Sequence, residues 1–289
     1  MTVQHTGNRA IPFLSNSRSA MPRRAFLLRG MVLALVATSV VLPAHAAETD
    51  PATILFTERT VTTPSGTYKY LIHIPAKLDR RGNLPVIVFL HGSGERGDDN
   101  TAQTKNGIRL MIAREGDGFP AVVVAPQCRA DNRWTAPEME AMVMKALDQT
   151  MTEFNGDPQR VYLTGLSMGA YGTWELAKRH PNRWAALAPV CGGIVSRNQT
   201  PETLPAGANP VNPYSVMATA VAPIPQWIFH GDADGAVPVS ESRQMAAILY
   251  ARKADVRYTE YPGVGHNSWD YAYKEPDLLP WLLAHKRKK

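Results

Sequence analysis

Short apolar runs alternate with amphipathic stretches along the chain from about residue 54. Residues 85–90 and 121–125 are continuous apolar runs, the pattern of strands that are covered on both faces. Further strands are expected at residues 161–164, 185–190, 226–229 and 256–261. Residues 54–62 and 68–74 are separated by a Pro-Ser-Gly turn, which predicts an antiparallel pair at one edge.

Between these strands the apolar positions follow helical spacing. The clearest case is residues 137–154, where Pro137 suits a first helical turn and the apolar residues from Met139 to Phe154 form one stripe. Other helices are expected at residues 108–113, 168–179, 240–251 and 277–284. Repeated strand–helix units of this size predict an α/β fold with a mostly parallel central sheet and helices on both faces.

Residues 194–225 interrupt this alternation. They contain six prolines and few large apolar side chains. The pattern is typical of an irregular, Pro-rich insertion in an otherwise regular domain.

Composition narrows the class of protein. The chain has 289 residues, of which 44% are hydrophobic and 19% are charged, as in globular proteins. It has only two cysteines, which excludes a disulfide scaffold and a zinc site with four cysteine ligands.

The formal charge of +6 has its origin at the ends of the chain. Residues 1–46 carry five arginines and no acidic residue, followed within that segment by an apolar run at 31–42 and a small-residue end, Ala44-His-Ala46. This is the anatomy of an export signal, and the run is too short for stable membrane insertion. The pair Arg23-Arg24 resembles a twin-arginine signal; a general secretory signal or a buried helix are the alternatives.

Cleavage after Ala46 would leave a single domain, 47–289, in the periplasm or outside the cell. Without the signal the chain has 26 basic and 25 acidic residues, and Lys286 to Lys289 account for four of the basic ones. No basic run interleaved with aromatic residues remains, so a nucleic-acid partner is not expected.

The segment Gly165-Leu-Ser167-Met-Gly169 lies between a predicted strand and a predicted helix. G-x-S-x-G in this context predicts a nucleophile elbow, in which glycines relieve the crowding around a sharp turn that presents a serine. The helix that begins here directs its N–H groups at Ser167, which favours the negative charge formed when a serine attacks a carbonyl.

A nucleophilic serine needs a base and a carboxylate that orients the base. His266 follows the last predicted strand in a glycine-rich loop, and we interpret it as the base. Asp232 and Asp234 both follow the strand before it; we favour Asp234 as the orienting residue, with Asp232 shaping the turn. The order Ser, Asp, His is the chain order of the elbow-bearing hydrolases.

The segment His91-Gly-Ser-Gly94 directly follows the strand at 85–90. Small residues at that place allow backbone N–H groups to approach a substrate oxygen closely. We expect an oxyanion hole formed by the amides of Ser93 and Met168.

Residues 54–285 resemble the α/β-hydrolase fold, most of all the bacterial esterase and predicted-peptidase group related to dienelactone hydrolases, carboxylesterase/phospholipases and feruloyl or polyhydroxybutyrate-type esterases. The matching pieces occur in order and are residues 90–100, 125–128 with Trp134, 165–174, 189–193, 230–234 and 265–266 with Trp269. The resemblance implies Ser167 as nucleophile, Asp234 as orienting acid and His266 as base.

Four further residues are singled out. Trp134 and Trp269 are candidates for lining the substrate pocket, with core packing as the alternative. Cys128 and Cys191 each follow a strand, and an exported protein permits a disulfide, but the strand order of this fold usually separates such positions. No metal-ligand motif or dinucleotide fingerprint occurs, so no cofactor is implied.

These features predict an exported serine hydrolase that cleaves carboxylic esters through an acyl-enzyme, with a small-molecule or polymer-derived ester as substrate. Two alternatives remain open. One is a serine peptidase on the same scaffold, and the other is a non-catalytic binding protein that retains the scaffold.

Overall fold

The computed structural model describes residues 49–75, 77, 83–195 and 212–287. The chain divides into two units, Met1–Pro43 and Ala44–Lys289, and the first unit lies outside the described residues. The predicted export signal is therefore also outside them.

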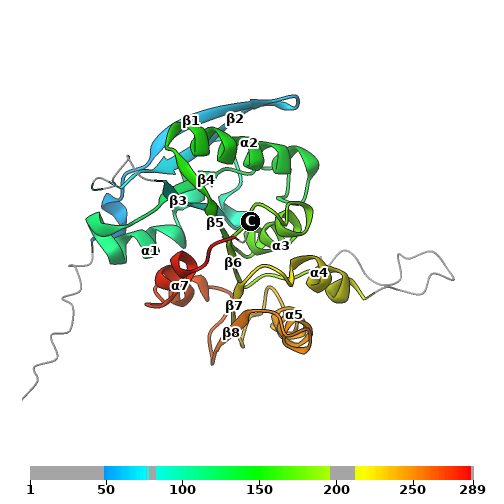
Figure 1. Ribbon diagram of the computed structural model, residues 1–289. Coiled ribbons are helices and arrows are strands. Elements are labelled where there is room, and N and C mark those ends of the chain that lie inside the picture. Colours follow the sequence, from blue (N-terminus) through cyan, green and yellow to red (C-terminus); the bar gives the residue numbers. More distant parts are fainter. Residues whose placement is uncertain (1–48, 76, 78–82, 196–211, 288–289) are drawn as a thin grey trace, which may run out of the picture. The chain divides into compact units, whose positions relative to one another are not determined.

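In the described part of the second unit, eight strands form a sheet in the order β1-β2-β4-β3-β5-β6-β7-β8 (Figure 1). The strands β1 and β2 pair in antiparallel fashion, as does β2 with β4, and all the other pairs are parallel. This confirms the mostly parallel sheet with a mixed edge. The strands are β1 Thr57–Thr63, β2 Gly66–His73, β3 Leu84–Leu90, β4 Val122–Pro126, β5 Gly156–Leu166, β6 Ala186–Val190, β7 Gln226–Gly231 and β8 Val256–Tyr261.

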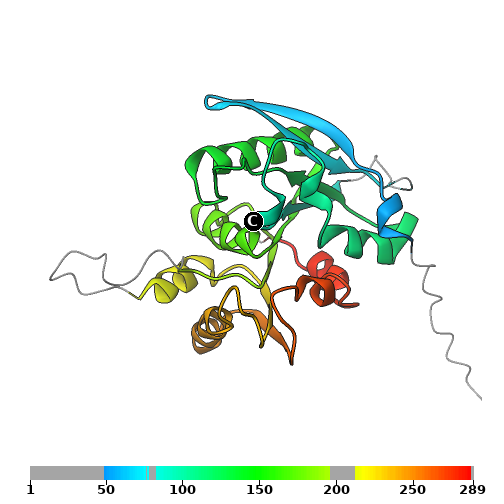
Figure 2. The same ribbon diagram turned by 180° about the vertical axis from the view of Figure 1, so that it is seen from behind.

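Helices cover both faces of this sheet (Figures 1 and 2). On one face α2 Pro137–Glu153, α3 Met168–Arg179, α4 Pro213–Val221 and α5 Ser240–Ala251 share an apolar core with alternate strand residues. On the other face α1 Ile108–Glu115, α6 Trp269–Ala272 and α7 Leu278–Ala284 share a second core. Short 3-10 helices are η1 Pro51–Thr53, η2 Ser93–Glu95, η3 Ala102–Thr104 and η4 Gly116–Gly118.

The two cores explain why the central strands are apolar on both sides. All residues of β3, β4, β6 and β7 are buried. Side chains alternate between the faces of a strand, so Val86 and Val88 enter one core while Ile87 and Phe89 enter the other. A strand of this kind presents its carboxyl end, and the loop after it, at one fixed edge of the sheet.

The prediction of an irregular insertion at 194–225 was wrong for its second half, where α4 forms. Asn212 caps this helix, because its side-chain oxygen accepts hydrogen bonds from the N–H groups of Tyr214 and Ser215, and Pro213 occupies the first turn. Tyr214, Met217, Ala218 and Val221 then form a buried helical stripe. Residues 196–211 lie outside the described part.

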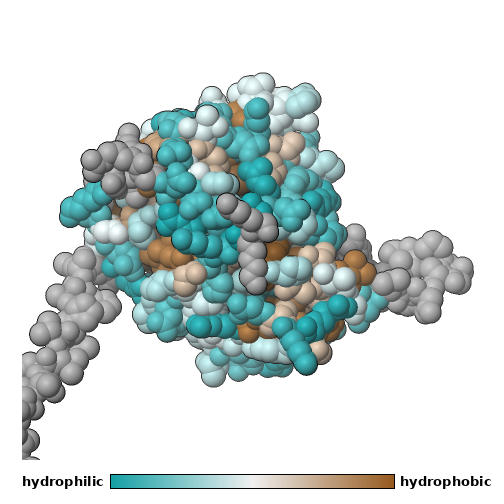
Figure 3. Space-filling view, in the orientation of Figure 1, coloured by the Kyte–Doolittle hydropathy of each residue, from teal (hydrophilic) through white to brown (hydrophobic). Residues whose placement is uncertain are grey.

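Hydrophobic residues on the face in Figure 3 occur as scattered patches among hydrophilic ones. Single exposed apolar side chains are normal on soluble domains. Among the described residues, no helix has the length and apolar character needed to cross a bilayer.

Candidate active site

Ser167 occupies a strained turn between β5 and α3. Its backbone has φ 52° and ψ −118°, a region that non-glycine residues rarely adopt. The neighbouring glycines make the turn possible: a Cβ on Gly169 would lie 1.9 Å from the carbonyl oxygen of Leu90, and one on Gly165 would lie 2.5 Å from the carbonyl oxygen of Gly169. The sharp turn predicted from G-x-S-x-G is therefore what the backbone forms.

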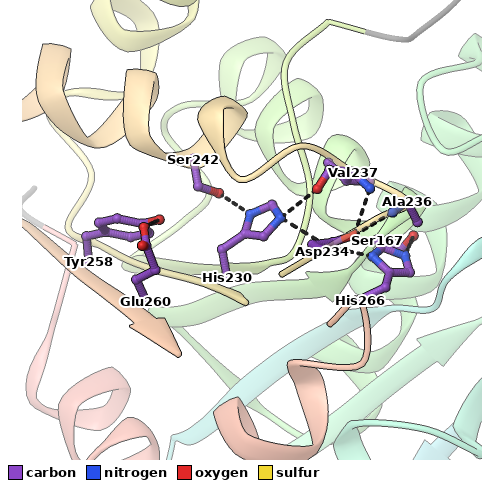
Figure 4. Close-up of polar contacts among 9 residues, drawn as sticks. All are labelled: Ser167, His230, Asp234, Ala236, Val237, Ser242, Tyr258, Glu260 and His266. Atoms are coloured by element: carbon purple, nitrogen blue, oxygen red, sulfur yellow. Dashed lines mark hydrogen bonds and ion pairs between the residues drawn. The ribbon is translucent and has the colours of Figure 1, made fainter. Parts of the chain in front are cut away.

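Ser167, His266 and Asp234 form a continuous chain of hydrogen bonds (Figure 4). The distance from Nδ1 of His266 to Oδ2 of Asp234 is 2.7 Å, and that from Nε2 of His266 to Oγ of Ser167 is 2.9 Å. An ionised carboxylate only accepts hydrogen bonds, so Nδ1 of His266 carries the proton. Nε2 is then free to accept a hydrogen bond from the hydroxyl of Ser167. This is the arrangement in which an imidazole can take a proton from serine.

Asp234 is held ionised although its side chain has no exposed surface. Burial alone would raise its pKa, but hydrogen bonds from His266 and from the N–H groups of Val237 and Ala236 outweigh burial, and the pKa is lowered. Asp232 is exposed and accepts a hydrogen bond from the N–H of Gly263, between β8 and His266. Of the two aspartates in the sequence hypothesis, the structure places Asp234 against the histidine and Asp232 in the turn.

A second histidine contacts the same carboxylate and was not predicted. Nε2 of His230 lies 3.1 Å from Oδ2 of Asp234 and 3.1 Å from the carbonyl oxygen of Val237, while Nδ1 lies 2.7 Å from Oγ of Ser242 (Figure 4). Burial lowers the pKa of His230, so the ring is neutral, with its proton on Nε2 and Nδ1 accepting from Ser242. The sequence signal for it was the segment His230-Gly-Asp-Ala-Asp234.

Ser93 and Met168 both line a cavity of about 1080 Å³ together with Ser167. Met168 is the first residue of α3 and Ser93 is the first residue of η2, positions whose N–H groups have no acceptor within their own helix. Both residues predicted to supply oxyanion-hole amides therefore line the same cavity as Ser167.

His91 supports the loop that carries Ser93. Its Nε2 accepts a hydrogen bond from the N–H of Cys128 (2.9 Å), so the proton is on Nδ1, which donates to the carbonyl oxygen of Gly92 (2.6 Å). Burial lowers the pKa of His91 to about 4, and the ring stays neutral. The loop after β3 is thereby fixed to the end of β4. In the sequence, His91 stands out only as part of the segment His91-Gly-Ser-Gly94.

The two tryptophans proposed for substrate contact have different surroundings. Trp134 is among the residues around the cavity but is only 1% exposed, and its indole N–H donates to the carbonyl oxygen of His91 (2.9 Å). Trp269 packs edge-on against the ring of His266, with ring centroids 5.3 Å apart, and lies outside the lining of that cavity. Each thus contacts a histidine of the site.

Cys128 and Cys191 are buried and free. They follow β4 and β6, and β3 and β5 lie between those strands, a separation of about 14 Å at usual strand spacing, which is twice the reach of a disulfide. Ligand atoms of Cys191, Asp234 and His266 lie within 4.8 Å of one another, but burial raises the pKa of the Cys191 thiol and both other groups are engaged in hydrogen bonds. We therefore assign no metal to this cluster.

The chain is similar to several known proteins. Poly(3-hydroxyalkanoate) depolymerase C of Paucimonas lemoignei is 28% identical over 192 residues, covering 62% of this chain and 42% of the depolymerase. An uncharacterized secreted protein of Arthroderma benhamiae is 26% identical over 263 residues, covering 80% of this chain and 28% of that protein. The chain thus spans less than half the length of these relatives.

Among solved structures, a thermostable esterase is 30% identical with a TM-score of 0.69, covering 80% of this chain and 63% of the esterase. A model of the prolyl oligopeptidase family matches residues 132–285, which include α2, the turn of Ser167 and the loops of Asp234 and His266. Because this match covers more than half of the chain, the protein belongs to the prolyl oligopeptidase family; it has the α/β-hydrolase fold and is similar to esterases.

Proposed function

We propose that this protein is an exported enzyme that hydrolyses carboxylic esters through Ser167, His266 and Asp234. The observation that carries the proposal is the hydrogen-bond chain from Ser167 through His266 to Asp234 beside the cavity. Relatives named as a poly(3-hydroxyalkanoate) depolymerase and as a thermostable esterase support an ester as the substrate.

In the first half of the reaction, Oγ of Ser167 attacks the ester carbonyl while its proton passes to Nε2 of His266. The carbonyl oxygen becomes negative and is stabilised by the N–H groups of Ser93 and Met168 and by the positive end of α3. Each such N–H contributes about 2.7–4 kcal/mol to transition-state stabilisation in comparable enzymes. His266 then gives its proton to the departing alcohol, and an acyl-enzyme remains.

In the second half, His266 removes a proton from water, which attacks the acyl carbonyl and releases the acid. Asp234 stays ionised throughout and stabilises the imidazolium that forms twice per cycle. Its lowered pKa suits this role, because the carboxylate keeps its charge over the whole pH range in which a histidine can act as a base.

The proposal includes export and a mature domain over 47–289, with residues 1–46 as the cleaved signal. The segment of five arginines without acidic residues and the secreted relative support it. N-terminal sequencing of the protein recovered outside the cytoplasm should begin at Ala47. Recovery of the intact Met1 terminus there would contradict a cleaved signal.

Hydrolysis of 4-nitrophenyl butyrate by the wild type and by Ser167→Ala tests the chemistry. The variant should lose at least about 10⁴-fold in kcat, because no other group can form the acyl-enzyme. A fluorophosphonate probe should label the wild type once, at Ser167. Ser240→Ala, an exposed serine at the start of α5, is the matched control and should keep both activity and labelling. Equal rates for the two variants would refute the proposal.

Peptide hydrolysis is a second candidate, because the family model that matches takes its name from an oligopeptidase. The same proton path through His266 would serve an amide, whose nitrogen needs protonation before it leaves. Short peptide 4-nitroanilides measured beside the esters separate the two. A kcat/KM for an anilide that exceeds the ester value would indicate that peptides are the substrate. A protein that neither cleaves these substrates nor reacts with the fluorophosphonate probe would favour the alternative of a non-catalytic binding protein.

A further inference from the structure

The cavity beside Ser167 has a strongly basic wall. Its charged lining residues are Arg96, Arg133, Lys178, Arg179 and Glu175. Positive groups therefore outnumber the one carboxylate at the place where a substrate has to lie. Such an excess of one charge in a concave site attracts ligands of the opposite charge.

The two cations on α3 are neutralised by neighbours. Lys178 Nζ lies 2.7 Å from a carboxylate oxygen of Glu175, and Arg179 is paired with Glu175 (2.8 Å) and with Glu140. A guanidinium or ammonium that already has a carboxylate partner contributes little to binding another anion. These residues therefore leave the net charge of their side of the wall near zero.

Arg96 and Arg133 differ from them, since within the described residues neither forms an ion pair. Arg96 is half-buried, and its guanidinium donates to two carbonyl oxygens, from Nε to Ser93 (3.0 Å) and from Nη1 to Asn132 (3.3 Å). Carbonyl oxygens hold the group in place without cancelling its charge. Arg133 is exposed and lines the same cavity.

The two arginines belong to one rigid part of the site. The bond from Arg96 to Ser93 fixes the guanidinium to the loop that carries a proposed oxyanion donor, and the bond to Asn132 fixes it to the turn before Arg133. Two of the five N–H groups of Arg96 are used by these bonds, and the planar guanidinium matches the two oxygens of a carboxylate. The cavity of about 1080 Å³ has room for such a substrate.

We propose that Arg96 and Arg133 bind a carboxylate group carried by the ester substrate, so that the enzyme prefers anionic esters to neutral ones. The proposal rests on the function proposed above. Two chemical sources supply such a group: an acyl part derived from a dicarboxylic acid, or an alcohol part that is itself a hydroxy acid, as at the free end of an oligomer of hydroxy acids.

Matched substrate pairs test the proposal on both sides of the ester. For the alcohol part the pair is 4-acetoxybenzoate and 4-acetoxybenzamide, which differ in charge but have similar size. For the acyl part the pair is mono-4-nitrophenyl adipate and 4-nitrophenyl hexanoate. The wild type should show about 10-fold higher kcat/KM for the anionic member of at least one pair, mainly through KM, and 0.5 M NaCl should reduce this preference.

Arg133→Gln is the informative variant, because the side chain of Arg133 makes no hydrogen bond within the described residues and its loss should not disturb the loop. It should lower kcat/KM about 5-fold for the preferred anionic ester and leave the neutral ester within about twofold. Arg252→Gln removes another exposed arginine, at the end of α5 and outside the cavity lining, and should change neither.

The outcomes separate the two proposals. Hydrolysis of neutral and anionic esters at equal kcat/KM in both pairs, or an equal loss on both members in Arg133→Gln, would overturn the anion site while the esterase function stands. Absence of ester hydrolysis together with absence of fluorophosphonate labelling would overturn both. The pair that shows the preference identifies which part of the ester bears the carboxylate.

Discussion

The two regions that meet at Ser167 use histidine in opposite ways. The loop after β3 carries Ser93, a proposed oxyanion donor, and His91 there is 1% exposed with both ring nitrogens bonded to backbone groups. The loops after β7 and β8 contribute ionisable side chains, and the side chain of His266 is 26% exposed. Burial keeps the first ring neutral, whereas the second lies between the hydroxyl of Ser167 and the carboxylate of Asp234.

The carboxylate makes the difference between the regions. Asp234 accepts hydrogen bonds from His266, His230 and two backbone N–H groups, so it is rigid and negative. Within the described residues, no carboxylate bonds to the ring of His91. That ring instead links the backbone of Gly92 to the backbone of Cys128 through two hydrogen bonds. The comparison shows that the ring of His266 combines a carboxylate partner with partial exposure, whereas the ring of His91 is buried and bonded to backbone groups.

The largest effect is expected from removing the charge of Asp234. Asp234→Asn should lower kcat for ester hydrolysis about 10⁴-fold, because an amide cannot stabilise the imidazolium and favours the wrong tautomer of His266. Asp232→Asn is the matched control on the same loop and should stay within about threefold of wild type. A comparable loss in both variants would mean that Asp232, not Asp234 alone, orients the base.

The pH dependence of stability tests whether the fold keeps His91 neutral. The pKa of His91 is about 4 in the folded protein and near 6.5 in the unfolded chain, so between these values the unfolded state binds more protons. The free energy of unfolding should therefore fall as the pH drops from about 7, by about 3 kcal/mol at pH 4 from this residue.

The buried His230, whose pKa is also lowered, adds to the same trend. Urea unfolding at several pH values between 7 and 4.5 checks it. His91→Gln keeps a donor and an acceptor but cannot titrate, so its stability should depend less steeply on pH. Identical slopes for the variant and the wild type would show that His91 is not held neutral by the fold.

Loss of the His91 ring should affect catalysis less than loss of Asp234. His91→Leu removes the bonds to Cys128 and Gly92 that hold the oxyanion loop, and we expect kcat to fall about 10- to 100-fold with KM nearly unchanged. The N–H of Cys128 and the carbonyl of Gly92, left without their hydrogen-bond partner, should also reduce the free energy of unfolding by about 1–3 kcal/mol. His91→Gln should recover much of both. An unchanged kcat in His91→Leu would remove the ring from any positioning role.

The smallest effects concern the two tryptophans, one in each region. Trp134→Phe loses the hydrogen bond to the His91 carbonyl, so we expect about 1 kcal/mol of destabilisation and a kcat lowered by about threefold. Trp269→Phe keeps an aromatic edge against His266 and should stay within about twofold. Thermal unfolding and initial rates measure both. A large rise in KM for either variant would indicate direct substrate contact instead.

Much of the fold was predictable because its signals are local. Continuous apolar runs predicted β3 and β4, because a strand buried on both faces has apolar residues at every position. Apolar stripes at helical spacing predicted α2 and α5, because a helix buried on one face repeats its apolar residues every three or four positions. The helix α4 was not predicted, because six prolines in residues 194–225 are typical of irregular structure. The capping residue Asn212 and the apolar stripe after it are the local signals of that helix. Pro213 begins that helix and does not break it.

The sequence by itself determined which residue types stand at the ends of successive strands: Ser167 in its glycine-flanked turn, two aspartates after one strand and His266 after the next. Only the tertiary structure decided that Asp234 faces His266, that His91 and His230 are neutral, that the cysteines stay apart, and that Arg96 and Arg133 have no carboxylate partner in the described chain. The reason is physical. Spacing along the chain sets what a segment can bury, whereas protonation and pairing depend on neighbours that arrive from distant segments when the sheet assembles.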